Sequence, residues 1–256
     1  MPENGTHITW YGQSAFRIET PDRRVLYIDP WFENPMYAEG ASELERIDRA
    51  DLVLVTHGHF DHVGSAAAIA RKTGAKLVAS LDLGMALARY GGFPKDLMSY
   101  ETLGNVGGVL SFFDGSVSIT ITPAVHSSHC SAAETKAGDD DRYHWAGNAS
   151  GFVIRVRDGI SIFHTGDTDL FGDLRYVSSE GPVDVMLACI GDHFTMGPAR
   201  AAEATRLVDP RTVVPMHFGT FLPMMTGTPE SFRSALEERG LGNRYRRLAV
   251  NETAIF

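Results

Sequence analysis

Cysteine is scarce in this sequence, with only Cys130 and Cys189 among 256 residues. Two thiols are too few for a disulfide framework in a chain of this length, so the fold must rest on an apolar core. Cys189 lies inside the apolar run 183–190, where we expect it to be a small buried side chain.

Long apolar segments are lacking as well. No stretch reaches the ~18 apolar residues that a membrane helix needs. The first residues also lack the basic and apolar regions of a signal peptide. We therefore expect no membrane span and a location in the cytoplasm.

Basic residues are outnumbered, because 23 Lys and Arg face 32 Asp and Glu and leave a formal net charge of −9. Binding to phosphate backbones depends on basic side chains, so nucleic acid is not expected as a partner. The densest basic cluster, at 239–247, is typical of a solvated helix end and strand edge. A small-molecule substrate suits this charge better, and a homo-oligomer stays open.

The most informative residues follow a short apolar run at 52–55, which predicts a buried strand. His57, His59, Asp61 and His62 come within six positions directly after it. Imidazole and carboxylate groups suit zinc and its first-row neighbours. Because the first two histidines can face one point and the next two residues a neighbouring point, we expect two adjacent metal ions.

The residues after this motif favour a helix. It is predicted to begin near Asp61 or His62, to continue through the helix formers up to Lys72 and to end at Gly74.

Alternating apolar residues and turn signals predict the other elements. The expected strands cover 7–10, 15–18, 25–28, 76–79, 109–113, 116–124, 151–157, 160–164, 183–190, 212–216 and a last one around 247–250. The first three should form an antiparallel meander. Helices are expected at 81–89, 199–208 and 229–239, and the polar segment 131–149 is expected to be a surface loop. The length of 256 residues favours one domain spanning 1–256.

Three further residues that could bind a metal occur later in the sequence, and each follows a predicted strand. They are His126, Asp167 and His217. Ligands that follow strands gather at one edge of a sheet, so we expect all three to join the histidine motif.

The sequence resembles the metallo-β-lactamase superfamily in Thr56-His57-Gly58-His59-Phe60-Asp61-His62, in His126, in Gly166-Asp167 and in His217. Within it the chain is similar to the small single-domain metal-dependent hydrolases. The segments that carry this likeness are 10–16, 28–30, 126–128, 166–168, 194–198 and 214–217. The ascorbate-phosphate lactonases and the N-acylphosphatidylethanolamine phospholipases are more distant relatives.

The resemblance implies an α/β fold, a four-layer αββα sandwich with two internally similar halves at about 1–120 and 121–256. It also implies how the ligands divide between two divalent metal ions. One ion would take His57, His59 and His126, the other would take Asp61, His62 and His217, and Asp167 would bridge them.

The expected activity is hydrolysis of a small ester, lactone or amide by a metal-activated water. Zinc is the expected metal, with manganese and iron as alternatives. Asp61 would orient or deprotonate the water. A phosphodiesterase acting on nucleotide or phospholipid is one alternative, and a redox or inactive metal-binding protein is another. His59 disfavours the redox alternative, because the oxygen-reducing branch of the superfamily typically has glutamate there.

Several residues are expected to support this chemistry. His193 and His129 are candidates for protonating the leaving group, and Asp29 or His164 would orient the metal ligands. Trp31, Phe194, Met196 and Phe221 are candidates for an apolar pocket wall. Relatives often carry glycine or asparagine where this chain has Asp192-His193, so the vicinity of the pocket differs from theirs.

Overall fold

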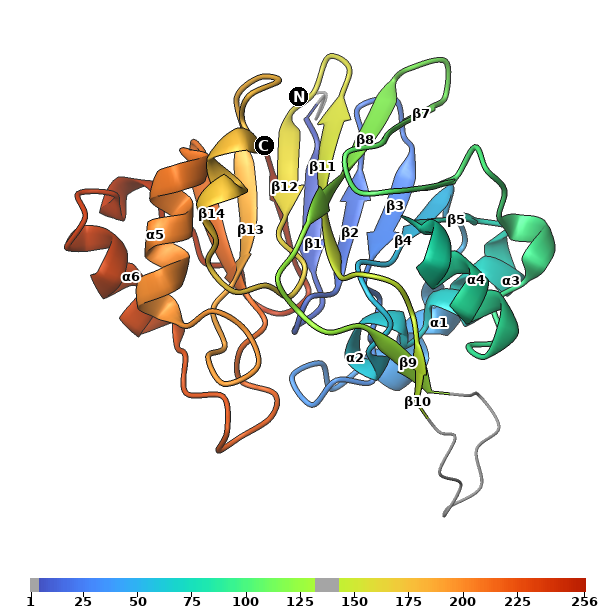
Figure 1. Cartoon of the computed structure of the whole chain (residues 1–256), viewed down its shortest axis with the longest axis horizontal. Coiled ribbons are helices and arrows are strands. Elements are labelled where there is room, and N and C mark those ends of the chain that lie inside the picture. Colours follow the sequence, from blue (N-terminus) through green and yellow to red (C-terminus); the bar gives the residue numbers. More distant parts are fainter. Residues whose placement is uncertain (1–4, 132–142) are drawn as a thin grey trace.

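The computed structural model describes residues 5–131 and 143–256, and in these residues two large sheets pack face to face (Figure 1). The first sheet has the order β15 (Glu252–Ile255), β1 (His7–Trp10), β2 (Phe16–Glu19), β3 (Val25–Ile28), β4 (Leu52–Leu54), β5 (Lys76–Ser80), β6 (Leu103–Gly104). The second has the order β14 (Thr212–Met216), β13 (Val185–Cys189), β12 (Ser161–His164), β11 (Ser150–Val156), β8 (Val117–Pro123), β7 (Val109–Phe112). A separate pair consists of β9 (His129–Ser131) and β10 (Tyr143–Trp145).

Helices cover the outer face of each sheet, which confirms the αββα sandwich (Figure 1). On the first sheet lie α1 (Gly40–Arg46), α3 (Ala66–Thr73) and α4 (Leu81–Arg89). On the second lie α5 (Pro198–Val208) and α6 (Pro229–Glu237). The described residues also contain three 3₁₀ helices, η1 (Lys95–Leu97), η2 (Gly172–Tyr176) and η3 (Gly242–Arg244), of which η2 contacts α5 and η3 contacts α6. The short α2 (Phe60–Val63) lies below the strands in Figure 1.

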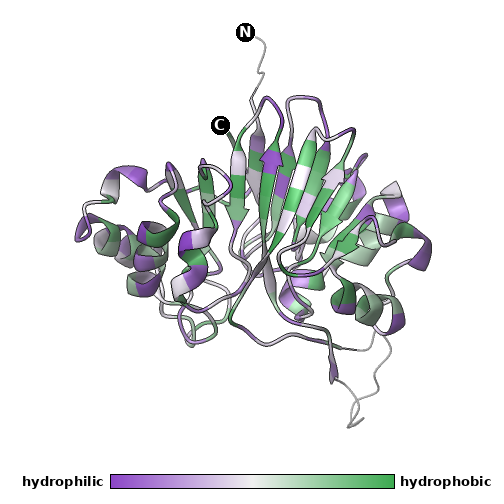
Figure 2. Ribbon diagram, turned by 45° about the horizontal axis from the view of Figure 1, so that its top comes forward, coloured by the Kyte–Doolittle hydropathy of each residue, from purple (hydrophilic) through white to green (hydrophobic). Residues whose placement is uncertain are grey.

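The strands bury both faces. Leu26 and Ile28 of β3 face the core between the sheets, whereas Val25 and Tyr27 face the helical layer. This follows from the two-residue period of a strand, which sends successive side chains to opposite faces. Figure 2 shows the result as green strands in the middle and purple stretches on the outer helices.

The sheet topology directs several strands to the same edge. β1, β2 and β3 form the predicted antiparallel meander, and β3, β4 and β5 then run parallel. In the second sheet β12, β13 and β14 are also parallel. His57, Asp167 and His217 follow the carboxyl ends of β4, β12 and β14, whereas His126 follows β8, which is antiparallel to its neighbours.

Two predicted elements were wrong. The single helix after the histidine motif is two helices, because the chain turns between α2 and α3 at Gly64 and the Ser65 amide donates to the carbonyl of Pro30 at 2.7 Å. The last strand is not at 247–250 but at β15, which pairs with β1. Its exposed, polar composition carries little apolar alternation, which is why the sequence pattern missed it.

The predicted loop at 131–149 is only partly covered by the structure. Positions 132–142 lie outside the described residues. The prediction was wrong at 131 and at 143–145, because β9 and β10 pair there as antiparallel strands. The division into two similar halves stays a prediction. None of the helices in 5–131 and 143–256 has the length and apolar character that crossing a membrane requires.

Candidate metal centre

The polar motif residues leave the ends of strands in both sheets and meet at one edge of the sandwich. His57 and His59 follow β4, and Asp61 and His62 lie on α2 directly after them. From the second sheet, His126 follows β8, Asp167 follows β12 and His217 follows β14. Residues up to 160 positions apart, such as His57 and His217, thus contribute to one cluster.

Three histidines form the first group of the cluster, and their ligand atoms lie within 4.8 Å of one another. His59 Nδ1 is 2.9 Å from His57 Nε2 and 3.3 Å from His126 Nε2. Two nitrogens bound to one tetrahedral zinc at its usual bond length would be about 3.3 Å apart. The three rings therefore have the spacing that a common metal ion requires.

The second group contains Asp61, His62, Asp167 and His217, again with ligand atoms within 4.8 Å. Asp167 Oδ2 lies 2.8 Å from His217 Nε2 and 3.3 Å from His62 Nε2. The same oxygen is 3.7 Å from His126 Nε2 and 3.9 Å from His57 Nε2. One carboxylate oxygen is thus close to ring nitrogens of both groups.

Unpaired polar atoms in this cluster fit a bound cation. His62 Nε2 and Asp167 Oδ1 are buried and make no hydrogen bond, although His62 Nε2 lies 3.3 Å from Asp167 Oδ2. Buried polar atoms are normally paired, and buried carboxylates normally meet a cation or a metal. Asp29, Asp61 and Asp167 are all buried, and among the described ion pairs none joins them to Lys or Arg. The donor set and its charge therefore fit divalent metal ions.

The first group consists of neutral imidazoles at pH 7. Burial, together with the neighbouring histidines, lowers the pKa of His59 to about 4. Burial also lowers the pKa of His57 well below its usual range and that of His126 below its usual value. Neutral imidazole is the form that binds metal.

The second group holds its histidines charged when no metal is bound. Burial opposes the charged form of His217, but Asp167 and Asp61 outweigh it and raise the pKa to about 9. Burial opposes the charge of His62 too, yet Asp167, Asp61 and Asp29 raise its pKa well above the usual range. The pKa of Asp167 is held well below its usual value against burial by His217 and His62. A metal ion bound here would replace two protons.

Asp29 orients one of these ligands. Its Oδ2 lies 2.7 Å from His62 Nδ1, and its two oxygens accept hydrogen bonds from the amide and the hydroxyl of Thr56 at 2.8 and 2.7 Å. With Nδ1 committed to this carboxylate, His62 presents Nε2 to the cluster. Carboxylate partners of this kind fix the orientation of metal-binding histidines.

His164 takes a different position from the one expected. Its Nε2 lies 3.1 Å from the carbonyl of Ser14, and its Nδ1 accepts the amide hydrogen of Gly166 at 3.1 Å. It therefore supports the turn that carries Asp167 rather than a ligand ring. Gly166 has φ +61°, and a side chain there would meet the carbonyl oxygen of Ser150, so the turn requires glycine.

A cavity of about 450 Å³ opens over the cluster. Its lining residues are His59, Phe60, Asp61, His126, Ser127, His129, Asp167, Phe194, His217 and Phe221. The cavity therefore joins the metal-type ligands of both groups to an apolar wall.

Comparison with known proteins agrees with this site. A model described as the β-lactamase superfamily domain matches residues 7–217. The chain is 46% identical over 248 residues to a UPF0173 metal-dependent hydrolase of Thermodesulfovibrio yellowstonii, covering 97% of this chain and 91% of the relative. The chain belongs to the metallo-β-lactamase superfamily.

Other members of the superfamily extend the likeness. A UPF0173 metal-dependent hydrolase of Anaeromyxobacter sp. strain K is 50% identical over 233 residues, covering 91% of this chain and 81% of the relative. The solved structure of Igni18, a metallo hydrolase from Ignicoccus hospitalis, is 33% identical with a TM-score of 0.81 and covers 98% of both chains. An isothiocyanate hydrolase from Delia radicum gut bacteria is 20% identical with a TM-score of 0.72, covers 98% of this chain and 99% of its own, and shows the shared fold.

The two histidines expected to protonate a leaving group lie in different settings. His129 lines the cavity, with Nδ1 3.2 Å from His59 Nε2. His193 is exposed, is not among the lining residues, and packs against Phe194 with a ring-centroid distance of 4.5 Å.

Asp192 and His193 lie in a tight turn beside the cavity residue Phe194. These residues have φ of +64° and +53°, in the left-handed region that glycine and asparagine adopt readily. The Asp192 side chain stabilises the turn by accepting hydrogen bonds from the Thr226 hydroxyl and the His193 amide, each at 3.0 Å.

Of the four residues expected in a pocket wall, three lie at or beside the cavity and one lies in the core. Phe194 and Phe221 line the cavity, and Trp31 stacks on Phe221 at 5.8 Å from behind. Met196 is fully buried and belongs to the core between the sheets, so its assignment to the pocket wall was wrong.

Two site residues were missed by sequence reasoning. The buried Gln13 donates from Nε2 to Asp61 Oδ2 at 2.9 Å and accepts from the Thr220 hydroxyl at 2.6 Å. Its place beside Gly12, within the segment 10–16 that carries the family likeness, was the available signal in the sequence. Phe60, between two ligand-type residues of the motif, lines the cavity and was not singled out.

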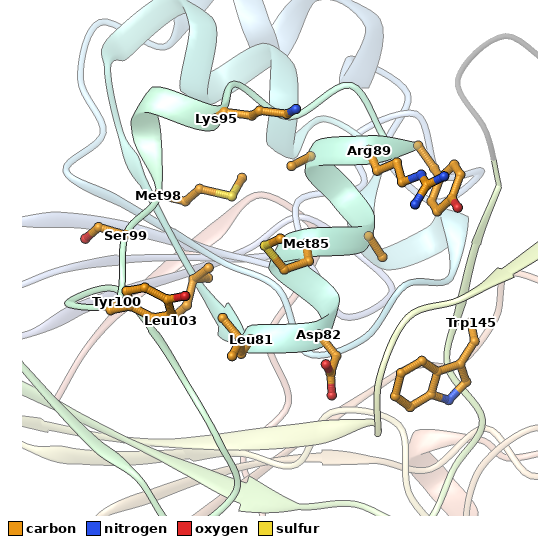
Figure 3. A pocket seen from close by; sticks show the side chains of 13 residues that line it. Leu81, Asp82, Met85, Arg89, Lys95, Met98, Ser99, Tyr100, Leu103 and Trp145 are labelled. Atoms are coloured by element: carbon orange, nitrogen blue, oxygen red, sulfur yellow. The ribbon is translucent and has the colours of Figure 1, made fainter.

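A larger groove, of about 740 Å³, lies along α4 and is a separate feature (Figure 3). Met85, Met98, Tyr100 and Trp145 are among its lining residues, and none of its lining residues belongs to the two metal-type groups. It has no chemistry of the kind found over the histidine cluster.

Proposed function

We propose that this protein is a metal-dependent hydrolase that holds two divalent metal ions. His57, His59 and His126 would hold one ion, Asp61, His62 and His217 the other, and Asp167 would be shared. Zinc is the first choice of metal, because histidine nitrogen and carboxylate oxygen suit it, and manganese or iron are the alternatives.

The position of Asp167 Oδ2 is the observation that carries this proposal. It lies within 3.3 Å of His217 Nε2 and His62 Nε2 and within 3.9 Å of His126 Nε2 and His57 Nε2. A single oxygen among four imidazole nitrogens from two groups supports a shared ligand. The names of the relatives, metal-dependent hydrolases, support the same activity.

Bound divalent ions supply Lewis acidity and a nucleophile at neutral pH. The protein side chains would position the reactants around them. Asp61 would orient the attacking water, because its carboxylate lines the cavity and Gln13 fixes one of its oxygens at 2.9 Å. The neighbouring histidines lower the pKa of Asp61 although burial opposes this, which keeps it ionised and favours orientation over proton uptake.

For contact with the leaving group, the cavity favours His129 over His193. His129 lines the space over the cluster, whereas His193 is exposed beside it. The His129 ring also lies 3.2 Å from Nε2 of His59. Substitution of His129 would therefore affect both a proposed metal ligand and the wall of the cavity.

An ester, lactone or amide is the proposed substrate class. The lining residues include no Lys or Arg, the side chains that usually bind phosphate oxygens. A nucleotide or phospholipid phosphodiester would therefore depend on the metal ions alone. Location in the cytoplasm and assembly into a homo-oligomer stay predictions.

A substrate screen before and after chelation tests the proposed function. We expect turnover of a small ester, lactone or amide that a chelator abolishes and added zinc restores. His59→Ala should lower kcat/KM on the order of 100-fold or more, because it removes a proposed metal ligand. His7→Ala, which changes a histidine outside both groups, is the matched control.

Two other outcomes would contradict the proposal. Cleavage of bis(4-nitrophenyl) phosphate without any ester, lactone or amide turnover would establish the phosphodiesterase alternative. Bound iron with no hydrolysis in the whole screen would favour the redox or inactive alternative.

A further inference from the structure

Three phenylalanine rings form the apolar wall of the cavity over the metal-type ligands. Phe60 lies in α2, Phe194 lies in the loop after β13, and Phe221 lies in the loop after β14. Three separate segments of the chain thus place an aromatic ring at the same opening.

The rings hold one another in place. Phe221 lies 5.9 Å from Phe60 and 6.1 Å from Phe194 between ring centroids, with edge-to-face geometry in both pairs. Trp31 stacks on Phe221 at 5.8 Å and meets Phe60 edge-on at 5.5 Å. These are preferred arrangements of aromatic pairs, so the wall is formed before any substrate arrives.

The wall is not part of either apolar core. Phe60 and Phe194 are 60% and 42% exposed. Neither they nor Phe221 appears in the core between the sheets or in the core beneath the helices, nor among the residues packed against these cores. Exposed rings gathered at a cavity indicate a binding surface, whereas scattered exposed rings do not.

The loop that carries Phe194 has a strained backbone. Asp192 and His193 are consecutive residues in the left-handed region, and the Phe194 amide donates to the carbonyl of Asp192 at 2.5 Å. Strain of this kind persists where surrounding contacts maintain it, and here the Asp192 side chain does so through Thr226. The turn therefore acts to position the Phe194 ring.

The charge of the cavity limits what can enter beside the rings. Its ionisable lining groups are imidazoles and the carboxylates of Asp61 and Asp167, with no Lys or Arg among them. A substrate carboxylate or phosphate away from the reacting bond would find no Lys or Arg side chain in this lining. An uncharged substrate avoids that penalty.

From these observations we infer that the substrate is an uncharged ester, lactone or amide that carries an aryl or alkyl group, and that this group packs against Phe60, Phe194 and Phe221. The reacting carbonyl then faces the polar side of the cavity. This inference rests on the proposed function and names its substrate class. The cavity of about 450 Å³ is of the size that takes small ligands.

Three methyl esters, which all release methanol, and one benzyl ester test the inference. Methyl phenylacetate has the apolar ring, methyl acetate lacks it, and methyl 4-carboxyphenylacetate adds a charge to it. Benzyl acetate places the ring on the alcohol side. We measure kcat/KM with the zinc-loaded protein. The higher of the values for methyl phenylacetate and benzyl acetate should exceed the values for methyl acetate and methyl 4-carboxyphenylacetate at least tenfold.

Phe194→Ala provides the decisive variant. We expect it to reduce the preference for the ring ester over methyl acetate at least tenfold, through a higher KM, while the metal content stays at the wild-type level. Phe194→Leu should restore most of the preference. Tyr100→Ala, which changes an 86% exposed ring in the separate groove along α4, should leave the preference unchanged.

Two results would overturn the inference. One is equal or better turnover of the carboxylated ester, and the other is an unchanged preference in Phe194→Ala. If no ester, lactone or amide is hydrolysed in the substrate screen, the proposed function fails, and a binding experiment then tests the inference separately. Ligand-observed NMR should then detect binding of phenylacetamide to the wild type but not to Phe194→Ala. Equal binding to both proteins would contradict the role of the phenylalanine rings in binding.

Discussion

At the scale of single residues, the site is set by side chains that contact the metal-type ligands from behind. Asp29 holds Nδ1 of His62 at 2.7 Å, and Gln13 holds Asp61 at 2.9 Å. Asp29, Gln13 and His217 all have positive φ, with values of 44°, 49° and 54°. Unfavourable backbone conformations concentrated at one site are typical of function.

Asp29→Asn tests this support directly. We expect zinc affinity to fall 10- to 100-fold, because the amide is a weaker partner for the His62 ring and does not fix its orientation as firmly. Competition with a chelator of known affinity measures the change. Asp173→Asn, a change at an exposed carboxylate next to Arg175, should leave zinc affinity unaltered, and equal affinities in both variants would contradict the role of Asp29.

The protonation of the second group predicts how metal affinity depends on pH. His217 has a pKa raised to about 9 and His62 has a raised pKa, so both carry a proton at pH 7 when no metal is bound. A metal ion must displace these protons, so affinity at this group should rise by about tenfold per pH unit for each proton between pH 6.5 and 8. His59, with a pKa lowered to about 4, is already neutral, so affinity at the first group should change little.

Calorimetric titration with zinc in buffers of different ionisation enthalpy measures this proton release. We expect one metal-binding step to release protons at pH 7 and the other to release few or none. Two steps with no proton release would contradict the charged state of His62 and His217.

At the scale of secondary-structure elements, most of the structure was predictable from the sequence. Short apolar runs ending in polar residues identified the strands that deliver His57, His126, Asp167 and His217, because a strand signals itself by two-residue alternation. The helix at 81–89 was predicted with the bounds that α4 has. The break between α2 and α3 was not, because it depends on contact with the loop at Trp31, which lies far away in sequence.

Gly64→Ala tests that break. A Cβ at this position would lie 2.9 Å from Trp31 Cα and 3.1 Å from the carbonyl oxygen of Pro30, which are backbone atoms that cannot rotate away. We expect the free energy of unfolding to fall by about 1–3 kcal/mol, as overpacking usually produces. Chemical denaturation of the metal-free protein gives the value.

Gly172→Ala is the matched control, because a Cβ there would meet no atom within 4 Å. Its free energy of unfolding should stay within about 0.5 kcal/mol of the wild type. Equal stability of Gly64→Ala and Gly172→Ala would show that the turn at Gly64 tolerates a side chain.

At the scale of the whole molecule, the two sheets bring together residues that sequence alone leaves far apart. The resemblance gave the four-layer order, but the return of the last strand to β1 was missed, because β15 is polar and only one of its residues is buried. The meeting of Phe60, Phe194 and Phe221 was not predictable either, because each ring comes from a different segment and no periodicity links them. Tertiary proximity, rather than local pattern, decides such features.

The proposed site holds two metal ions, with Asp167 shared between them. Elemental analysis of zinc-saturated protein tests it most directly, with Asp167→Ala measured beside the wild type. We expect about two zinc ions per wild-type chain and fewer than one in the variant, because both groups lose the same oxygen. One zinc ion or less in the wild type, or an unchanged content in Asp167→Ala, would contradict it.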